Sequence, residues 1–141
     1  MPEVEIVNTR TFEQTRADLG AAFLRILGYF REDGEKALLR LEQAMRAHDS
    51  AALVLPAHTL KGEARHFGAL PLGDLAELIE SGARKCVDHR ETPEELLVHV
   101  AALRPLFEET LGWFERHTNP LATRARGIAR AGVENQSFGR I

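Results

Sequence analysis

Apolar residues recur at spacings of three and four along most of this chain. One stripe runs from Leu19 to Met45, and others lie within residues 50–67, 71–86 and 92–114. That spacing matches the 3.6-residue period of a helix that buries one face. The alternation typical of strands occurs only in the short stretch VEIV near the start. The pattern therefore predicts an all-α protein with four long amphipathic helices.

Local signals predict where the first helices begin. Thr11, with Gln14 three residues later, has the form of a capping box that opens a short leading helix at Phe12. The first long helix is expected from Leu19 to about His48. Each glycine inside a helix costs up to about 1 kcal/mol relative to alanine, so packing must hold this helix. Its glycines are Gly20, Gly28 and Gly34.

The second long helix is expected at about residues 50–67. Asp49 or Ser50 can serve as its N-cap, and Gly68 can end it. Pro56 lies inside this helix and removes one backbone hydrogen bond. We therefore expect a late start or a slight bend.

Prolines also mark the remaining helices. Pro71 suits the first turn of the third long helix. The stretch Thr92-Pro-Glu-Glu95 predicts an N-cap, a proline at the first helical position and a glutamate that closes the capping box. Pro105 predicts a kink in the last long helix. Four such helices with short links form an up-down bundle, here with a short extra helix at the N-terminus.

The helical pattern ends near Thr118, which divides the chain into a bundle at residues 1–118 and a tail at residues 119–141. The tail has scattered glycines, and its single acid is Glu134. We expect a mobile basic tail, with a docked terminal helix as the alternative. Its basic residues are Arg124, Arg126, Arg130 and Arg140.

Composition narrows the class of protein. Of the 141 residues, 44% are hydrophobic and 28% are charged, as in a globular protein. The formal net charge is −3, whereas a nucleic-acid-binding domain normally has a basic surplus. The single cysteine, Cys86, cannot form an internal disulfide. No apolar run is long enough for a membrane span, and the acidic start of the sequence is unlike a signal peptide. We expect a cytoplasmic protein that binds neither nucleic acid nor membrane.

The second long helix carries the candidate chemistry. At about 100° per residue, its apolar stripe comprises Leu53, Ala57, Leu60, Ala64 and Phe67. His58 falls on the opposite side of the helix and is expected to be exposed. The residues within about 60° of it are Val54, Leu55, Lys61, Gly62 and Arg65.

Each neighbour of His58 has a chemical interpretation. An exposed imidazole is largely the free base near neutrality, so a ring nitrogen can attack phosphorus. Lys61 and Arg65 supply positive charge for phosphoryl oxygens. Gly62 lets the backbone of a partner protein approach closely. The apolar surface available to that partner is Val54 and Leu55. Together these residues predict a phosphohistidine carrier that docks a partner.

The stretch AHTLKGEARHFGA at residues 57–69 resembles the phosphoacceptor motif of histidine-containing phosphotransfer (HPt) domains. The resemblance extends from about Leu19 to Phe114, and it includes YFREDGEKALLRLEQAMRAHDS before the motif and Ile79-Glu80 after it. The family is a four-helix bundle with its histidine exposed in mid-helix, as expected here. The departures are Glu63, where a small residue is more common, and Pro56.

The resemblance implies a function and a set of partners. His58 would take a phosphoryl group from an aspartyl phosphate on one response-regulator receiver domain and pass it to an aspartate on another. A histidine kinase, including a hybrid kinase, would stand upstream. HPt domains hold no nucleotide, and the sequence has no nucleotide-binding motif. We therefore expect a phosphocarrier without cofactor or metal, acting as a monomer, while Mg²⁺ comes with the receiver.

Three alternatives remain open. His58 can be an incidental surface histidine, although its position beside Lys61 and Gly62 argues against this. Glu63 and His66 match one half of a di-iron site, which requires a second such pair and two further inward carboxylates. The third alternative is a helical-bundle adaptor that binds receiver domains without becoming phosphorylated.

Overall fold

The computed structural model describes residues 5–118 of the chain, and the expected tail lies outside them. The chain divides into two units, Met1–Thr110 and Leu111–Ile141. The helical elements are α1 (Thr9–Leu19), the 3₁₀ turn η1 (Gly20–Ala22), α2 (Phe23–Arg46), α3 (Ser50–His66), α4 (Leu70–Asp88), the 3₁₀ turn η2 (Glu94–Leu96) and α5 (Leu97–Thr118).

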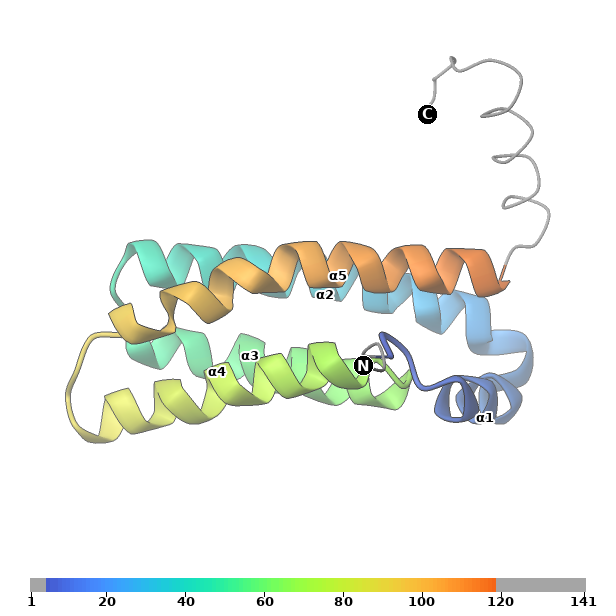
Figure 1. The fold of residues 1–141 in the computed structure, drawn as a ribbon, viewed down its shortest axis with the longest axis horizontal. Coiled ribbons are helices and arrows are strands. Elements are labelled where there is room, and N and C mark those ends of the chain that lie inside the picture. The colour runs from blue at the N-terminus through green and yellow to red at the C-terminus, as the bar shows by residue number, and fades with distance from the viewer. Residues whose placement is uncertain (1–4, 119–141) are drawn as a thin grey trace, which may run out of the picture. The chain divides into compact units, whose positions relative to one another are not determined.

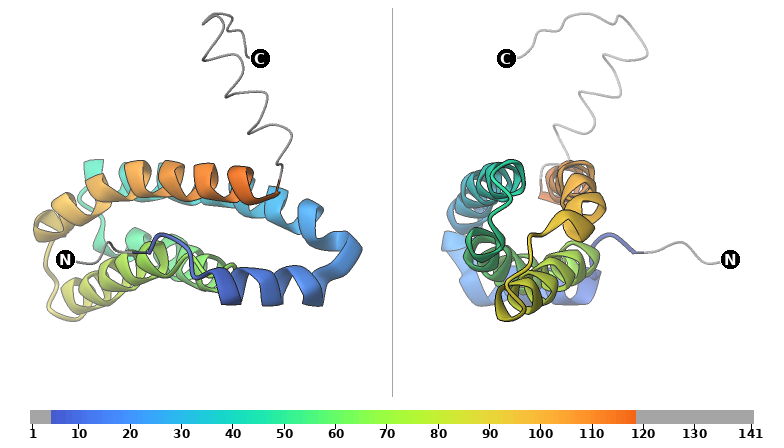
Figure 2. Two further views of the ribbon diagram at one scale, coloured as in Figure 1. Left: turned by 45° about the vertical axis from the view of Figure 1, so that its right-hand side comes forward. Right: turned by 90° about the vertical axis from the view of Figure 1, so that its left-hand side faces the viewer.

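The first unit contains four helical segments that run side by side in alternating directions: α2, α3, α4 and the part of α5 up to Thr110 (Figures 1 and 2). Short links at residues 47–49 and 67–69 connect α2 to α3 and α3 to α4, which makes these neighbours antiparallel. Residues 5–118 contain no strand, and this includes residues 5–7 of the stretch VEIV. The predicted all-α, up-down bundle is confirmed.

A row of aromatic rings lies in the interior of this unit among aliphatic side chains. Five phenylalanines form a chain of neighbouring rings, with successive centroids 5.4 to 6.0 Å apart. The rings follow the order Phe12, Phe23, Phe67, Phe30 and Phe107. Tilted and edge-on pairs at such distances add to the stabilisation from apolar burial. The expected buried stripes thus meet in one core, to which α1, α2, α5 and the link after α3 contribute these rings.

The N-terminal helix begins earlier than predicted. Its N-cap is Asn8, whose Oδ1 accepts a hydrogen bond from the Thr11 N–H at 2.9 Å. The Gln14 amide instead donates to Asp18 at 2.9 Å, so the predicted capping box and start at Phe12 are wrong. Asparagine caps a helix as well as threonine does, and here it lies at the position that the backbone requires.

The first long helix is also interrupted. Gly20 has φ +55°, a left-handed conformation that favours glycine, and it ends α1. A 3₁₀ turn follows before α2 starts at Phe23. The apolar spacing from Leu19 onward did not reveal this break, because apolar residues on both sides of it face the same core.

Helix α3 begins as one of the two predicted alternatives. Asp49 is the N-cap and accepts a hydrogen bond from the Ala52 N–H at 3.1 Å. Ser50 instead donates to the carbonyl of Glu91 at 2.7 Å. Because the helix starts at Ser50 and continues through Pro56, a late start is excluded.

The far end of α3 is held by the N-terminal segment. Gly68 has φ +82°, and its carbonyl accepts a hydrogen bond from the Asn8 N–H at 2.7 Å. A Cβ at this position would lie 2.7 Å from the Asn8 carbonyl oxygen. The Thr15 hydroxyl donates to the carbonyl of His66 at 2.6 Å. The predicted glycine at the end of this helix is therefore required both by its conformation and by the close approach of the segment at Asn8.

Helices α4 and α5 differ in how well their starts were predicted. Pro71 lies in the first turn of α4, as expected. The predicted capping box at Thr92 is wrong, because Pro93 is the N-cap of η2 with no side-chain cap, and the Thr92 hydroxyl donates to Glu94. Helix α5 then starts at Leu97 and continues through Pro105.

Within the second unit, the described residues complete α5. The Trp113 ring stacks on His117 with centroids 3.6 Å apart. Over residues 5–118, we find no helix with the length and apolar character needed to cross a membrane.

Candidate functional site

His58 lies in the middle of α3 and is exposed, as the helical wheel predicted. Leu53, Ala57, Leu60 and Ala64 bury the opposite face of the helix completely. The His58 side chain is 55% exposed. The helix backbone therefore fixes the position of the imidazole, while one side of the ring remains open to a partner.

The imidazole is oriented by a carboxylate from the neighbouring helix. His58 Nδ1 lies 3.0 Å from Oε2 of Glu80 on α4. An ionised carboxylate only accepts hydrogen bonds, so Nδ1 carries the proton and Nε2 carries the lone pair. Nε2 is on the other side of the ring, so it is the nitrogen available as a nucleophile.

Glu80 is ionised although it is buried. Its side chain is 7% exposed. Burial alone would raise the pKa of this carboxyl, but the contacts from Lys61, Arg84 and His58 outweigh burial and lower the pKa to about 2. At neutral pH the carboxylate therefore stays charged beside His58.

Lys61 also contacts Glu80. Its Nζ lies 2.7 Å from Oε1, and its side chain is 22% exposed. The two charges form an ion pair, and no hydrogen-bond donor among the described residues is aligned with that oxygen. The expected role of Lys61 toward phosphoryl oxygens stays a prediction, and the structure shows that its ammonium contacts the same carboxylate as His58.

Gly62 faces open space. A Cβ built at this position meets no atom within 4 Å, in contrast to Gly34 and Gly73, where neighbouring side chains would be displaced. Packing within the described chain therefore gives no reason for a glycine here, although alanine would stabilise the helix by about 1 kcal/mol. This is consistent with the prediction that Gly62 leaves room for a partner.

The two expected docking residues differ in exposure. Leu55 is 69% exposed, whereas Val54 is half-buried. Val54 lines a shallow groove of about 300 Å³ between α3 and α4. The other lining residues are Ala51, Arg84, Val87 and Asp88. Val54 lies one turn before His58, so the groove lies on the side of α3 that carries the histidine.

Arg65 is engaged elsewhere. Its guanidinium donates a hydrogen bond to Asp74 at 3.0 Å and another to Glu77, both on α4. These bonds raise the pKa of Arg65 further above its usual range. Among residues 5–118 its charged partners thus lie outside the cluster of His58, Lys61, Glu80 and Arg84. A contact of Arg65 with phosphate or with a partner stays a prediction.

Reasoning from the sequence did not assign a role to Glu80 or Arg84. One signal was present for Glu80: it follows Ile79 directly and lies four residues after Ala76, so a charge interrupts the apolar stripe of α4. A charge at a core position normally has a buried partner. The identity of that partner depended on how α3 and α4 pack.

The described residues do not support the di-iron alternative. Glu80 is the only carboxylate among residues 5–118 that is classed as buried, and it contacts His58, Lys61 and Arg84. Glu63 is half-buried, and burial together with the charge of Asp33 raises its pKa. The second pair and the inward carboxylates that such a site requires are not found in this part of the chain.

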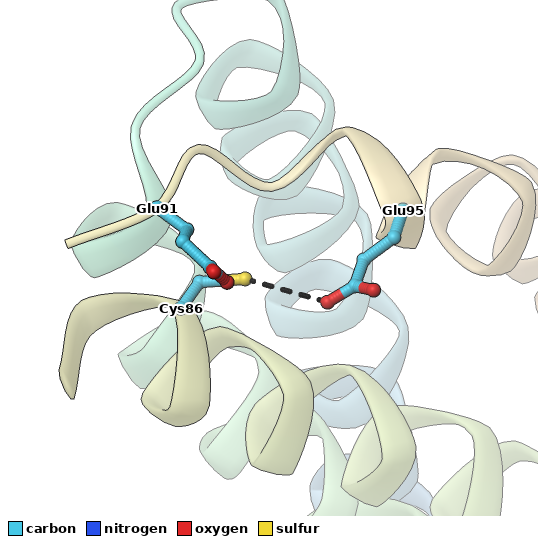
Figure 3. A group of neighbouring side chains, drawn as sticks. All are labelled: Cys86, Glu91 and Glu95. Atoms are coloured by element: carbon cyan, nitrogen blue, oxygen red, sulfur yellow. Dashed lines mark hydrogen bonds between the residues drawn. The ribbon is translucent and has the colours of Figure 1, made fainter. Parts of the chain in front are cut away.

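A second group of polar side chains lies near the link between α4 and α5 (Figure 3). Ligand atoms of Cys86, Glu91 and Glu95 lie within 4.8 Å of one another. The Cys86 thiol donates to Glu95 at 3.8 Å, and burial with the two nearby carboxylates raises its pKa. The contact is a structural hydrogen bond.

The helical bundle therefore presents an exposed histidine, His58, against a buried carboxylate, Glu80. Comparison with known protein families matches the Hpt domain over residues 25–111. This is more than half of the chain, and the protein therefore belongs to the Hpt domain family.

One solved structure supports the same fold. The chain is similar to histidine-containing phosphotransfer protein B (HptB) from Pseudomonas aeruginosa PAO1, with 22% sequence identity and a TM-score of 0.71. The similarity covers 82% of this chain and 96% of that chain. A search of the curated proteins found no match.

Proposed function

We propose that this chain is a histidine phosphotransfer protein of a two-component phosphorelay and that His58 carries the phosphoryl group. The observation that supports this most directly is the His58–Glu80 contact. It holds the proton on Nδ1 and leaves Nε2 as an exposed nucleophile.

The transfer step follows from this geometry. The lone pair of Nε2 forms a bond to phosphorus while the bond between phosphorus and a receiver's aspartyl oxygen breaks. The carboxylate leaves with that electron pair. The ring becomes positively charged, and the buried Glu80 carboxylate compensates this charge through Nδ1–H. Donation to a second receiver is the same step in reverse.

The partners follow from the family. Receiver domains supply and accept the phosphoryl group, and a histidine kinase stands upstream in the cytoplasm. The chain acts as a carrier without its own nucleotide, and the divalent ion for in-line transfer enters with the receiver. We propose that Lys61 meets the phosphoryl oxygens and that Gly62, Val54 and Leu55 form the docking surface.

Label transfer from a phosphorylated receiver domain to the full chain tests the site. His58→Gln should abolish an acid-labile label, while His66→Gln, an exposed histidine of the same helix, should retain it. Because the His58 side chain is largely exposed, its replacement should change the unfolding free energy by about 1 kcal/mol at most. Label that persists in the His58 variant, or a variant that does not fold, contradicts the assignment.

The adaptor alternative predicts a different outcome. A bundle that only binds receivers would co-purify with a receiver but would show no label in either variant. The ionised carboxylate on Nδ1 favours the carrier, because binding alone does not require an oriented imidazole.

A further inference from the structure

One oxygen of Glu80 serves two donors. His58 Nδ1 lies 3.0 Å from Oε2, and Arg84 Nη2 and Nε lie 2.8 and 3.2 Å from the same oxygen. Arg84 is one turn beyond Glu80 on α4, and its side chain is 57% exposed. A largely solvent-exposed cation thus contacts the oxygen atom that orients the proposed phosphoacceptor.

This shared contact limits what Glu80 can do for His58. The Arg84 guanidinium is permanently charged, so it partly neutralises the negative charge of Oε2 throughout the pH range of the experiments below. The stronger that interaction, the less Glu80 stabilises the positive charge that develops on the imidazole during attack on phosphorus. The other charged group on this carboxylate is Lys61, which contacts Oε1.

Arg84 also lines the groove beside His58. Ala51, Val54 and Val87 provide its apolar wall, and Arg84 and Asp88 provide its charges. A protein that covers His58 and fills this groove therefore meets the Arg84 guanidinium. An acidic side chain at that point of the partner would compete with Glu80 for it.

We propose that Arg84 is a positioning residue that couples occupation of this groove to the reactivity of His58. A partner carboxylate draws Arg84 away from Oε2, and Glu80 then acts on His58 alone. The isolated chain is thereby held in a less reactive state until an acidic partner docks. This inference rests on the proposed role of His58 as phosphoacceptor.

Direct phosphorylation by phosphoramidate tests, without a partner protein, whether Arg84 lowers the reactivity of His58 through Glu80. Nε2 forms the bond to phosphorus, the P–N bond of the N-protonated donor breaks, and ammonia leaves with the electron pair of that bond and is then protonated by water. The rate is measured from pH 5 to pH 9 on the full chain, with phosphohistidine detected by ³¹P NMR. Arg84→Ala should raise the plateau rate about threefold and move the acidic limb of the profile to higher pH by about half a pH unit.

Two variants separate this role from general support of the helix. Arg84→Lys keeps a charge four residues after Glu80 and should restore the original profile. Lys85→Ala removes a neighbouring exposed cation of α4 that does not line the groove and should leave the profile unchanged. An unchanged profile in Arg84→Ala, or a lower rate with an unmoved limb, overturns the proposal.

The coupling between partner docking and the reactivity of His58 is tested with a phosphorylated receiver domain as the phosphoryl donor. Arg84→Ala should raise the KM for the receiver several-fold and leave kcat equal or higher, since the docking contact is lost but Glu80 is released. A fall in kcat at constant KM overturns the coupling. If the unsubstituted chain accepts no phosphoryl group from phosphoramidate at His58, the proposed function fails, and this outcome is distinct from a failure confined to Arg84.

Discussion

Replacing Glu80 with glutamine removes a buried charge while keeping the size of the side chain. The carboxyl has a pKa of about 2, compared with an ordinary value of 4.5. Each pKa unit corresponds to about 1.4 kcal/mol, so the lowered pKa contributes roughly 3 to 4 kcal/mol to folding at neutral pH, the net result of the burial penalty and the contacts with His58, Lys61 and Arg84. The carboxylate is almost completely buried, so little of this is lost to solvent screening.

The pH dependence of this effect has a definite sign. A carboxyl whose pKa is lowered on folding stabilises the native state fully above about pH 5, and this stabilisation is lost as the pH falls from 4.5 toward 2. Glutamine does not titrate in this range. The difference in unfolding free energy between the two chains should therefore narrow by about 2 kcal/mol between pH 7 and pH 3. The other carboxylates are present in both chains, so their contributions to the pH dependence cancel in this difference.

Urea unfolding followed by circular dichroism at pH 7, 4 and 3 measures this difference. Glu77→Gln is the matched control, since Glu77 is an exposed acid of the same helix paired with Arg65, and should cost less than about 1 kcal/mol. A difference for Glu80→Gln that is constant with pH, or absent at pH 7, would refute the reasoning. Phosphate acceptance should fall about 10- to 100-fold, because the amide oxygen still accepts from Nδ1–H but lacks the charge.

Further predictions concern neighbouring features. Lys61→Met should slow phosphoryl transfer about tenfold or more at saturating receiver. Gly62→Leu should mainly raise the Kd for the receiver. If both variants show equal defects that are confined to binding, these separate roles of Lys61 and Gly62 are wrong. Deleting residues 119–141 should leave thermal unfolding unchanged and at most lower the stopped-flow association rate at low salt; a large loss of stability would mean that the tail docks on the bundle. Gly34→Ala should destabilise the fold by about 1–3 kcal/mol in urea unfolding, because the added Cβ would clash with the buried ring of Phe107. Gly28→Ala is the control: its Cβ meets open space, so it should stabilise the fold by up to about 1 kcal/mol. The reverse order of stabilities would show that packing against the ring does not limit residue 34.

The features that depend on one helix at a time could be predicted from the sequence. Helical periodicity separated the buried side of α3 from the side with His58, and it placed Lys61 and Gly62 beside the histidine. The structure confirms the exposure of His58 and the bundle that presents it. These properties follow from the 3.6-residue repeat alone, because side chains three and four residues apart share a face whatever the helix packs against.

Local capping was predicted less well than periodicity. Asn8 replaced Thr11 as the first cap, and Pro93 stands where Thr92 was expected. Several residues near a helix start can accept the same backbone hydrogen bonds. The packing of the segment around them determines which one does, as the contact of Asn8 with Gly68 shows.

Only the tertiary structure decided which charges meet. Glu80 is 22 residues from His58 in the chain, and the packing of α4 against α3 places its carboxylate against Nδ1. The same packing pairs Arg65 with Asp74 and Glu77 and leaves it outside the cluster. Periodicity defines the faces of each helix, but the rotation and axial position of one helix against another depend on how all the buried side chains fit together. The sequence alone therefore predicted His58 as the candidate nucleophile, and the packed bundle determined which carboxylate contacts it.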